Sequence, residues 1–304
     1  MSTLCGGVWV PATTPFQTDG QVSHSLFLKH CQYLLHEGAD GLAILGTTSE
    51  ANSLSVSERL DLLNLLIGKG IRPEQLMPGT GSCSIVDAVQ LTRAAVTAGC
   101  AGALALPPFY YKAAVDDEGL FAYFSELIEH VGDERLRLYL YHIPPVAQMG
   151  FSLHLIERLL KRYASIIAGL KDSSGDFKNT LAVIGAFPSL RVFPGSESFL
   201  LDGLRAGGAG CITATGNINV PAIKQVYLHW KTPAAESLQA EVARRRKIVE
   251  SFPVISAIKA VLARRYGEPI WRQMRVPLIS LDEKREDKLI QALVEDGYSI
   301  SVET

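Results

Sequence analysis

Short apolar runs rich in β-branched residues recur eight times in the first 213 residues of the chain. Each run is followed by small or polar residues and then by a stretch with apolar residues at helical spacing, which is typical of βα units around a parallel sheet. The apolar runs span residues 7–13, 41–46, 76–79, 102–106, 136–141, 166–171, 191–195 and 210–213. Helical stretches between them include residues 55–67, 85–98, 119–130 and 153–163.

Eight βα units are the number at which a parallel sheet closes into a (β/α)8 barrel. An open doubly wound sheet is the alternative, but no GxGxxG or P-loop motif follows any of the runs. Beyond residue 213 the pattern is helical, and its prolines, Pro221 among them, are expected to lie outside the periodic segments. We therefore predict an α/β fold with a barrel over residues 1–221 and a C-terminal helical appendage over residues 222–304.

The composition favours small-molecule chemistry. The 304 residues are 47% hydrophobic and carry a formal net charge of -2, which gives ample core and no basic surface for nucleic acid or anionic membranes. No stretch approaches the roughly 20 apolar residues of a membrane span, and the first residues lack a secretory pattern, so we expect a cytoplasmic protein. The five cysteines form no CxxC motif and are expected to be reduced core residues.

A lysine stands where one of the apolar runs ends. Lys171 follows the run 166–170 and precedes the polar segment 172–176. An amine at the end of a buried strand loses solvation, which favours its neutral, nucleophilic form and suits a Schiff-base lysine. The alternative is a surface lysine paired with Asp172, since most lysines are solvated.

Other polar side chains also follow apolar runs, and reacting groups collect at the carboxyl ends of strands in such barrels. Residues 46–49 offer consecutive backbone N–H groups, and the hydroxyls of Thr47 and Thr48 add donors for a carboxylate. Packing of β-branched side chains at a strand end explains the two threonines equally well. Tyr141 ends the fifth run, and a phenol beside Lys171 would move protons, although alternation alone does not say which face lines the barrel.

Three motifs carry a family resemblance: Gly-Thr-Thr-Ser-Glu at 46–50, Tyr-His-Ile-Pro at 141–144 and Gly-Leu-Lys-Asp-Ser-Ser-Gly-Asp at 169–176. The chain resembles, over essentially its whole length, the dihydrodipicolinate synthase/N-acetylneuraminate lyase family of class I pyruvate-dependent aldolases. The resemblance implies pyruvate held as an imine on Lys171 without a metal or organic cofactor. It further implies that Tyr141 relays protons and that Thr47 and Thr48 bind the carboxylate.

The same resemblance assigns further site residues. Gly195 and Ile212 match positions that line the pyruvate pocket. Tyr110, or Tyr111 if the register differs by one, matches a tyrosine that enters the neighbouring subunit's site and completes a relay with Tyr141 and Thr47. A homo-oligomer, a dimer or a tetramer, is therefore implied. Glu197 is predicted to bind substrate hydroxyls, with a carboxylate favoured at a helix N-terminus as the alternative.

Departures from the family pattern bear on the substrate. Ser49 replaces a glycine, which restricts the backbone there. Val146 stands where the synthases place an arginine that clamps the carboxylate of aspartate semialdehyde. The segment that begins at His142 resembles the corresponding segment of the sialate lyases and sugar-acid aldolases. The sialate lyases carry an acidic pair after strand seven, whereas this chain has Gly-Ser-Glu-Ser at residues 195–198.

We therefore predict a Schiff-base lyase or aldolase that breaks or forms the C3–C4 bond of pyruvate-derived 2-oxo acids, such as 2-oxo-3-deoxy sugar acids. A dihydrodipicolinate synthase, and a dehydratase of 2-oxo-3-deoxy sugar acids using the same imine, remain as alternatives. A pyruvate-binding barrel without turnover is a third, which the lysine and tyrosine argue against. A metal-dependent aldolase would need clustered ligands, whereas the seven histidines are scattered.

Overall fold

Parallel strands at the centre of the molecule form two ladders. The computed structural model describes residues 5–300, and in this range the strand orders are β2-β1-β7 and β3-β4-β5-β6. The strands are β1 (Gly7–Val10), β2 (Gly41–Leu42), β3 (Ala103–Ala105), β4 (Leu138–His142), β5 (Ile167–Asp172), β6 (Arg191–Pro194) and β7 (Gly210–Ile212). Seven of the eight predicted runs thus form strands.

The remaining apolar run, residues 76–79, joins the two ladders without becoming a regular strand. Leu76 forms a parallel bridge with Leu42 of β2, and Gly79 forms one with Leu104 of β3. Pro78 lies between them and has no N–H to donate, so it contributes only its carbonyl, which accepts from Leu104 at 2.9 Å. The run therefore occupies the predicted third strand position in an irregular form.

The ring closes on its other side between β6 and β7. The backbone N–H of Ala209 donates to the carbonyl of Val192 at 2.8 Å, which links the two strands where no continuous ladder forms. The prediction of a (β/α)8 barrel is confirmed.

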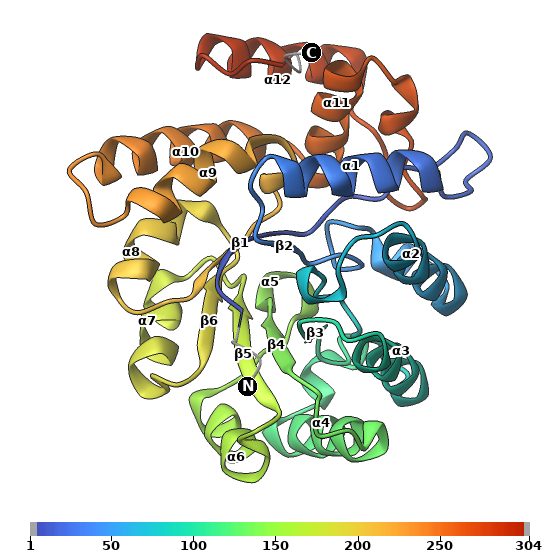
Figure 1. Cartoon of the computed structure of the whole chain (residues 1–304), viewed down its shortest axis with the longest axis vertical. Helices are drawn as coiled ribbons and strands as arrows, with labels where there is room; N and C mark the ends of the chain where they lie inside the picture. The colour runs from blue at the N-terminus through green and yellow to red at the C-terminus, as the bar shows by residue number, and fades with distance from the viewer. Residues whose placement is uncertain (1–4, 301–304) are drawn as a thin grey trace.

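Helices surround the strands, and those of the C-terminal tail gather on one side of the barrel beside α1 (Figure 1). Around the barrel lie α1 (His24–His36), α2 (Val56–Gly68), α3 (Ile85–Thr97), α4 (Asp117–Val131), α5 (Pro144–Ala147), α6 (Leu153–Tyr163), α7 (Phe177–Ala186), α8 (Leu200–Arg205) and α9 (Gly216–His229). The tail contains α10 (Ala235–Glu250), α11 (Val254–Tyr266) and α12 (Glu283–Glu295). None of these helices is long and apolar enough to cross a bilayer, within the part of the chain described. All five cysteines are free.

Helix α9 corrects two expectations about the start of the tail. Pro221 lies inside this helix rather than outside a periodic segment. It is tolerated because Asn219, at φ -133° and ψ 24°, breaks the helix two residues earlier, so that Pro221 falls in the first turn after the break. The predicted boundary at 221/222 also cuts this helix. Its buried Ile223 and Val226 pack in the same apolar cluster as β1, so α9 belongs with the barrel.

The position of the Tyr139 ring shows which faces of the neighbouring strands point into the barrel. Tyr139 on β4 is fully buried, and a Cβ placed on Gly102 or Gly169 would come within 2.5 Å of its ring. Glycine on the two neighbouring strands therefore leaves the space that the ring fills. Side chains two residues along a strand share a face, so Tyr141 and Lys171 point into the barrel as well, one layer nearer the carboxyl ends.

The tail is fastened to the barrel through the guanidinium of Arg275. It donates to the carbonyls of Gly20 and Ser53 at 2.8 Å and 2.7 Å, and it pairs with the carboxylate of Glu58 at 2.9 Å. The Arg275 hydrogen bond, which outweighs the effect of burial, lowers the pKa of Glu58 to about 2. Glu58 also closes the capping box of α2 with Ser55.

We expect Glu58→Gln to lower the free energy of unfolding near pH 7 by about 1 kcal/mol, a value reduced for the partial exposure of the pair. Glutamine can still accept the capping hydrogen bond, so the decrease in the free energy of unfolding measures the contribution of the Glu58 charge. Because the pKa of Glu58 is lower in the folded chain, its stabilisation is complete above about pH 4.5 and is lost as the pH falls toward 2. The free energies of unfolding of the wild type and the variant, measured in urea, should therefore approach each other below about pH 5 and become equal only near pH 2.

Glu134→Gln, which removes an exposed acid that forms no side-chain bond within residues 5–300, provides the matched control. It should leave stability unchanged at every pH. A constant difference between the Glu58 variant and the wild type from pH 7 to pH 3 would contradict the assignment.

Candidate active site

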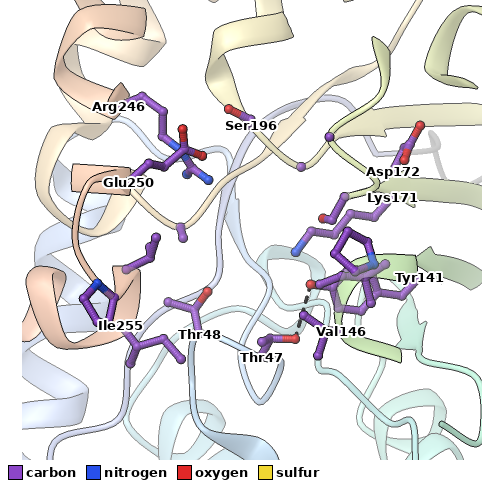
Figure 2. A pocket seen from close by; sticks show the side chains of 18 of the residues that line it. Thr47, Thr48, Tyr141, Val146, Lys171, Asp172, Ser196, Arg246, Glu250 and Ile255 are labelled. Atoms are coloured by element: carbon purple, nitrogen blue, oxygen red, sulfur yellow. Dashed lines mark hydrogen bonds and ion pairs between the residues drawn. The ribbon is translucent and has the colours of Figure 1, made fainter. Parts of the chain in front are cut away.

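A cavity of about 540 Å³ opens at the carboxyl ends of the strands, between the barrel and the tail. Its walls come from the loops after several strands and from α10, α11 and the segment that follows α11. Figure 2 shows Lys171 and Tyr141 on one side of this cavity and Arg246 and Glu250 on the other. The barrel thus supplies the larger part of the lining, and the tail supplies the rest.

Lys171 projects into this cavity from β5. Its side chain is 5% exposed and makes no ion pair with any residue of the described range. The side chain of Asp172 points away from that of Lys171 (Figure 2). Its carboxylate accepts from Asn179 at 2.9 Å and from Thr180 at 2.7 Å. The alternative of a surface lysine paired with its neighbour is therefore wrong.

Tyr141 pairs directly with Lys171 across β4 and β5. The Nζ of Lys171 lies 4.2 Å from the centre of the tyrosine ring, and the phenolic oxygen lies 3.3 Å from Oγ1 of Thr47. Burial would raise the pKa of Tyr141, but the charge of Lys171 and hydrogen bonds from Thr47, Lys171 and Ser173 outweigh burial and lower it. A phenol in this setting can give a proton to, or take one from, a group bound at the amine.

The loop after β2 forms the floor of the cavity. Thr47 and Thr48 both line it, and within residues 5–300 no protein group accepts from their backbone N–H groups. Ser49 does not strain the turn, because the positive φ values fall on Leu45 at 59° and Glu50 at 56°. The hydroxyl of Ser49 donates to the carbonyl of Ala12 at 2.6 Å, which ties the loop to the end of β1. The loop therefore brings the hydroxyls of Thr47 and Thr48, and two backbone N–H groups without a protein acceptor among residues 5–300, to the cavity that Lys171 enters, a combination suited to a carboxylate.

A buried ion pair anchors the far end of this loop to the tail. The carboxylate of Glu50 contacts the Nζ of Lys259 on α11, and both side chains are almost wholly buried. Lys259 also donates to the carbonyl of Gln273 at 2.8 Å, and Glu50 accepts from the backbone N–H of Arg275 at 3.2 Å. Burial, only partly opposed by Glu50, lowers the pKa of Lys259 to about 8.

Three further residues were predicted to line the pocket or to bind substrate, and only one of them lines the cavity. Gly195 lines the cavity, where a Cβ would lie 2.0 Å from Oγ of Ser173, so a side chain at this position would displace the neighbouring wall. Ile212 is fully buried in the barrel core and does not line the cavity. Glu197 is also fully buried, and its carboxylate is bound by the hydroxyls of Thr213 and Thr215 rather than turned toward a substrate. Neither Ile212 nor Glu197 lines the cavity, and the contact of either residue with substrate stays a prediction.

Tyr110 and Tyr111 lie on the surface, with 74% and 60% of each residue exposed. Their rings meet edge to face at 5.7 Å, and neither lines the cavity. The assignment of one of them to a neighbouring subunit's site stays a prediction.

The sequence reasoning missed Arg246 and Glu250, which line the cavity from α10. The predicted site residues follow strands, whereas these two residues reach the cavity from the appendage. Their opposite charges at positions i and i+4 of a predicted helix were the available signal, but such pairs are common on exposed helix faces.

A family model described as the dihydrodipicolinate synthetase family matches residues 4–296 of the chain. A DapA-like lyase of Chloroflexus aurantiacus is 33% identical over 282 residues, covering 91% of this chain and 92% of the relative. A 4-hydroxy-tetrahydrodipicolinate synthase of Thermosynechococcus vestitus is 29% identical, with 91% and 93% of the two chains covered.

Solved structures agree with these relatives. The dihydrodipicolinate synthase of Agrobacterium tumefaciens superposes with a TM-score of 0.89 at 31% identity, covering 95% of this chain and 98% of that one. YagE, a prophage protein of E. coli K12 solved in complex with pyruvate, has a TM-score of 0.88 at 24% identity, covering 98% of this chain and all of the other. The second likeness shows the fold alone.

Replacing Lys259 tests the anchor of the loop. We expect Lys259→Met to lower the free energy of unfolding by about 3 to 5 kcal/mol, because it leaves the carboxylate of Glu50 charged and unpaired in the interior. The double variant Lys259→Met with Glu50→Gln should recover part of this loss, since neither charge then remains. Thermal and urea unfolding would measure both effects, and a single variant as stable as the wild type would refute the role of the pair.

Proposed function

The chain belongs to the dihydrodipicolinate synthetase family and is a carbon–carbon lyase of that family, and we propose that it acts through an imine between Lys171 and pyruvate or another 2-oxo acid. One observation carries the proposal. The amine of Lys171 is buried, forms no ion pair with the described residues, and is turned into the cavity beside the phenol of Tyr141. The nearby hydroxyls of Thr47 and Thr48 are suited to the carboxylate of such a substrate.

The proposed reaction begins when the uncharged amine of Lys171 attacks C2 of the 2-oxo acid. The carbonyl oxygen leaves as water, and Tyr141 moves the protons that this exchange requires. In cleavage, the C4 hydroxyl loses its proton and the protonated imine takes up the electron pair of the C3–C4 bond. The fragment that begins at C4 then leaves as an aldehyde. The resulting enamine is protonated at C3, and water hydrolyses the imine to release pyruvate. Condensation follows the same steps in reverse.

A homo-oligomer is part of the proposal. Tyr110 is exposed and far enough from its own cavity to be absent from the lining, which suits a side chain that completes the relay of a neighbouring subunit.

A cytoplasmic location is also part of the proposal, and it is inferred from the sequence alone.

Val146 supports cleavage of sugar-acid substrates over the synthase alternative. It lines the cavity after β4, where the synthases' arginine would hold a second carboxylate, and valine offers no such contact. A dehydratase would form the same imine but release water from the substrate instead of an aldehyde, so product analysis separates the two reactions.

Borohydride trapping tests the imine directly. Incubation with pyruvate and borohydride is expected to add the mass of one reduced pyruvyl group on the peptide containing Lys171 and to abolish activity. Lys171→Met should acquire no adduct, because the thioether side chain has no amine. Failure to trap pyruvate or any other 2-oxo acid on folded wild-type protein would refute the proposed function.

Tyr141→Phe is expected to lower kcat for pyruvate release by about 10² to 10⁴-fold, the usual contribution of a positioned proton donor. Tyr139→Phe is the matched control, because Tyr139 lies on the same face of β4 one layer deeper and does not line the cavity. Equal activity of the two variants would remove Tyr141 from the mechanism.

A further inference from the structure

We propose that Arg246 and Glu250 form a binding subsite for the aldehyde portion of the substrate and select an uncharged, hydroxylated aldehyde. The inference rests on the proposed function, since it names the partner that reacts with the pyruvyl group on Lys171. Both side chains line the same cavity and lie across it from Lys171 and Tyr141 (Figure 2). An aldehyde fragment bound between the two sides would extend from the reacting carbon toward α10.

A buried network holds the guanidinium of Arg246 in place. Its Nη1 donates to the hydroxyls of Thr213 and Thr215 at 3.2 Å and 3.5 Å, and these hydroxyls donate to the two carboxylate oxygens of Glu197. Its Nε donates to Glu250 at 2.7 Å. Within residues 5–300 its Nη2 has no protein partner, so one forked N–H group is left for a ligand.

The charges around Arg246 favour a neutral ligand. The guanidinium lies 3.5 Å from the carboxylate of Glu197 and is hydrogen-bonded to that of Glu250, so one cation faces two anions. A ligand carboxylate would place a third negative charge beside these two, which is unfavourable in a partly buried site. An uncharged hydroxyl can bind both side chains, because it can accept from Nη2 of Arg246 and donate to the half-exposed carboxylate of Glu250.

Among residues 5–300, the rest of this side of the cavity offers no other cation. The tail contributes mainly apolar side chains, including Val254, Ile255, Met274 and Leu278. Lys171 is the nucleophile, and Val146 occupies the position of the synthases' arginine. The subsite thus combines one hydroxyl-binding pair with apolar walls suited to the C–H groups of a short carbon chain.

Condensation with pyruvate tests the selection. Initial rates would be measured with glyceraldehyde, with succinic semialdehyde, which carries a carboxylate, and with butanal, which carries neither group. The wild type is expected to show a kcat/KM for glyceraldehyde at least about tenfold above the other two. Glu250→Gln should reduce the ratio of glyceraldehyde to succinic semialdehyde by about fivefold or more, because one anion is removed. Glu236→Gln removes the same charge from the exposed start of α10 and should leave the ratio unchanged.

A second variant tests the guanidinium itself. Arg246→Lys keeps a positive charge between the two carboxylates but loses the fork, and it should lower kcat/KM for glyceraldehyde more than for butanal. Borohydride trapping of pyruvate on each variant separates the two proposals. Normal trapping with an unchanged aldehyde ratio, or a wild-type preference for succinic semialdehyde or butanal, overturns the subsite alone. No trapping on the wild type overturns the proposed function with it.

Discussion

The register between β4 and β5 is the constraint on which the site depends. Tyr141 faces Lys171 across these strands because the ring of Tyr139, one layer below, requires a residue without a side chain at Gly169. A shift by one residue would turn Lys171 to the outside of the barrel and bring Asp172 inside. The buried ring of Tyr139 therefore fixes the amine of Lys171 and the phenol of Tyr141 on one side of the cavity. No ion pair between the two side chains is needed for this arrangement.

The C-terminal tail lines the candidate active site as well as covering the barrel. Through Lys259 it anchors Glu50 and so the loop that carries Thr47 and Thr48, and through α10 it supplies the cavity wall opposite Lys171. The same helices share a separate apolar cluster of their own. Their packing thus positions two groups of site residues that are far apart in the chain, which couples the shape of the substrate pocket to the folding of the appendage.

Much of the fold and of the reacting centre could be predicted because both follow from local patterns. Recurring apolar runs followed by helical spacing indicated the βα units, and polar residues at strand ends indicated Lys171, Tyr141 and Thr47. Glu197 could not be placed in this way. A residue just after a strand can turn toward the cavity or into the core, and only the partners Thr213, Thr215 and Arg246, distant in sequence, drew its carboxylate inward. Pro221 was misplaced because a break at Asn219 has no mark in the hydrophobic pattern.

Local chemistry along the chain was enough to predict a parallel barrel and to single out Lys171 and Tyr141 at the ends of neighbouring strands, since strand alternation and strand ends are encoded over a few residues. Tertiary packing alone decided that Lys171 forms no ion pair with residues 5–300, that Ser49 avoids strain, and that Arg246 and Glu250 complete the cavity. These outcomes depend on which distant groups meet in a low-dielectric interior, where a buried charge or hydroxyl must find its partners wherever the fold brings them.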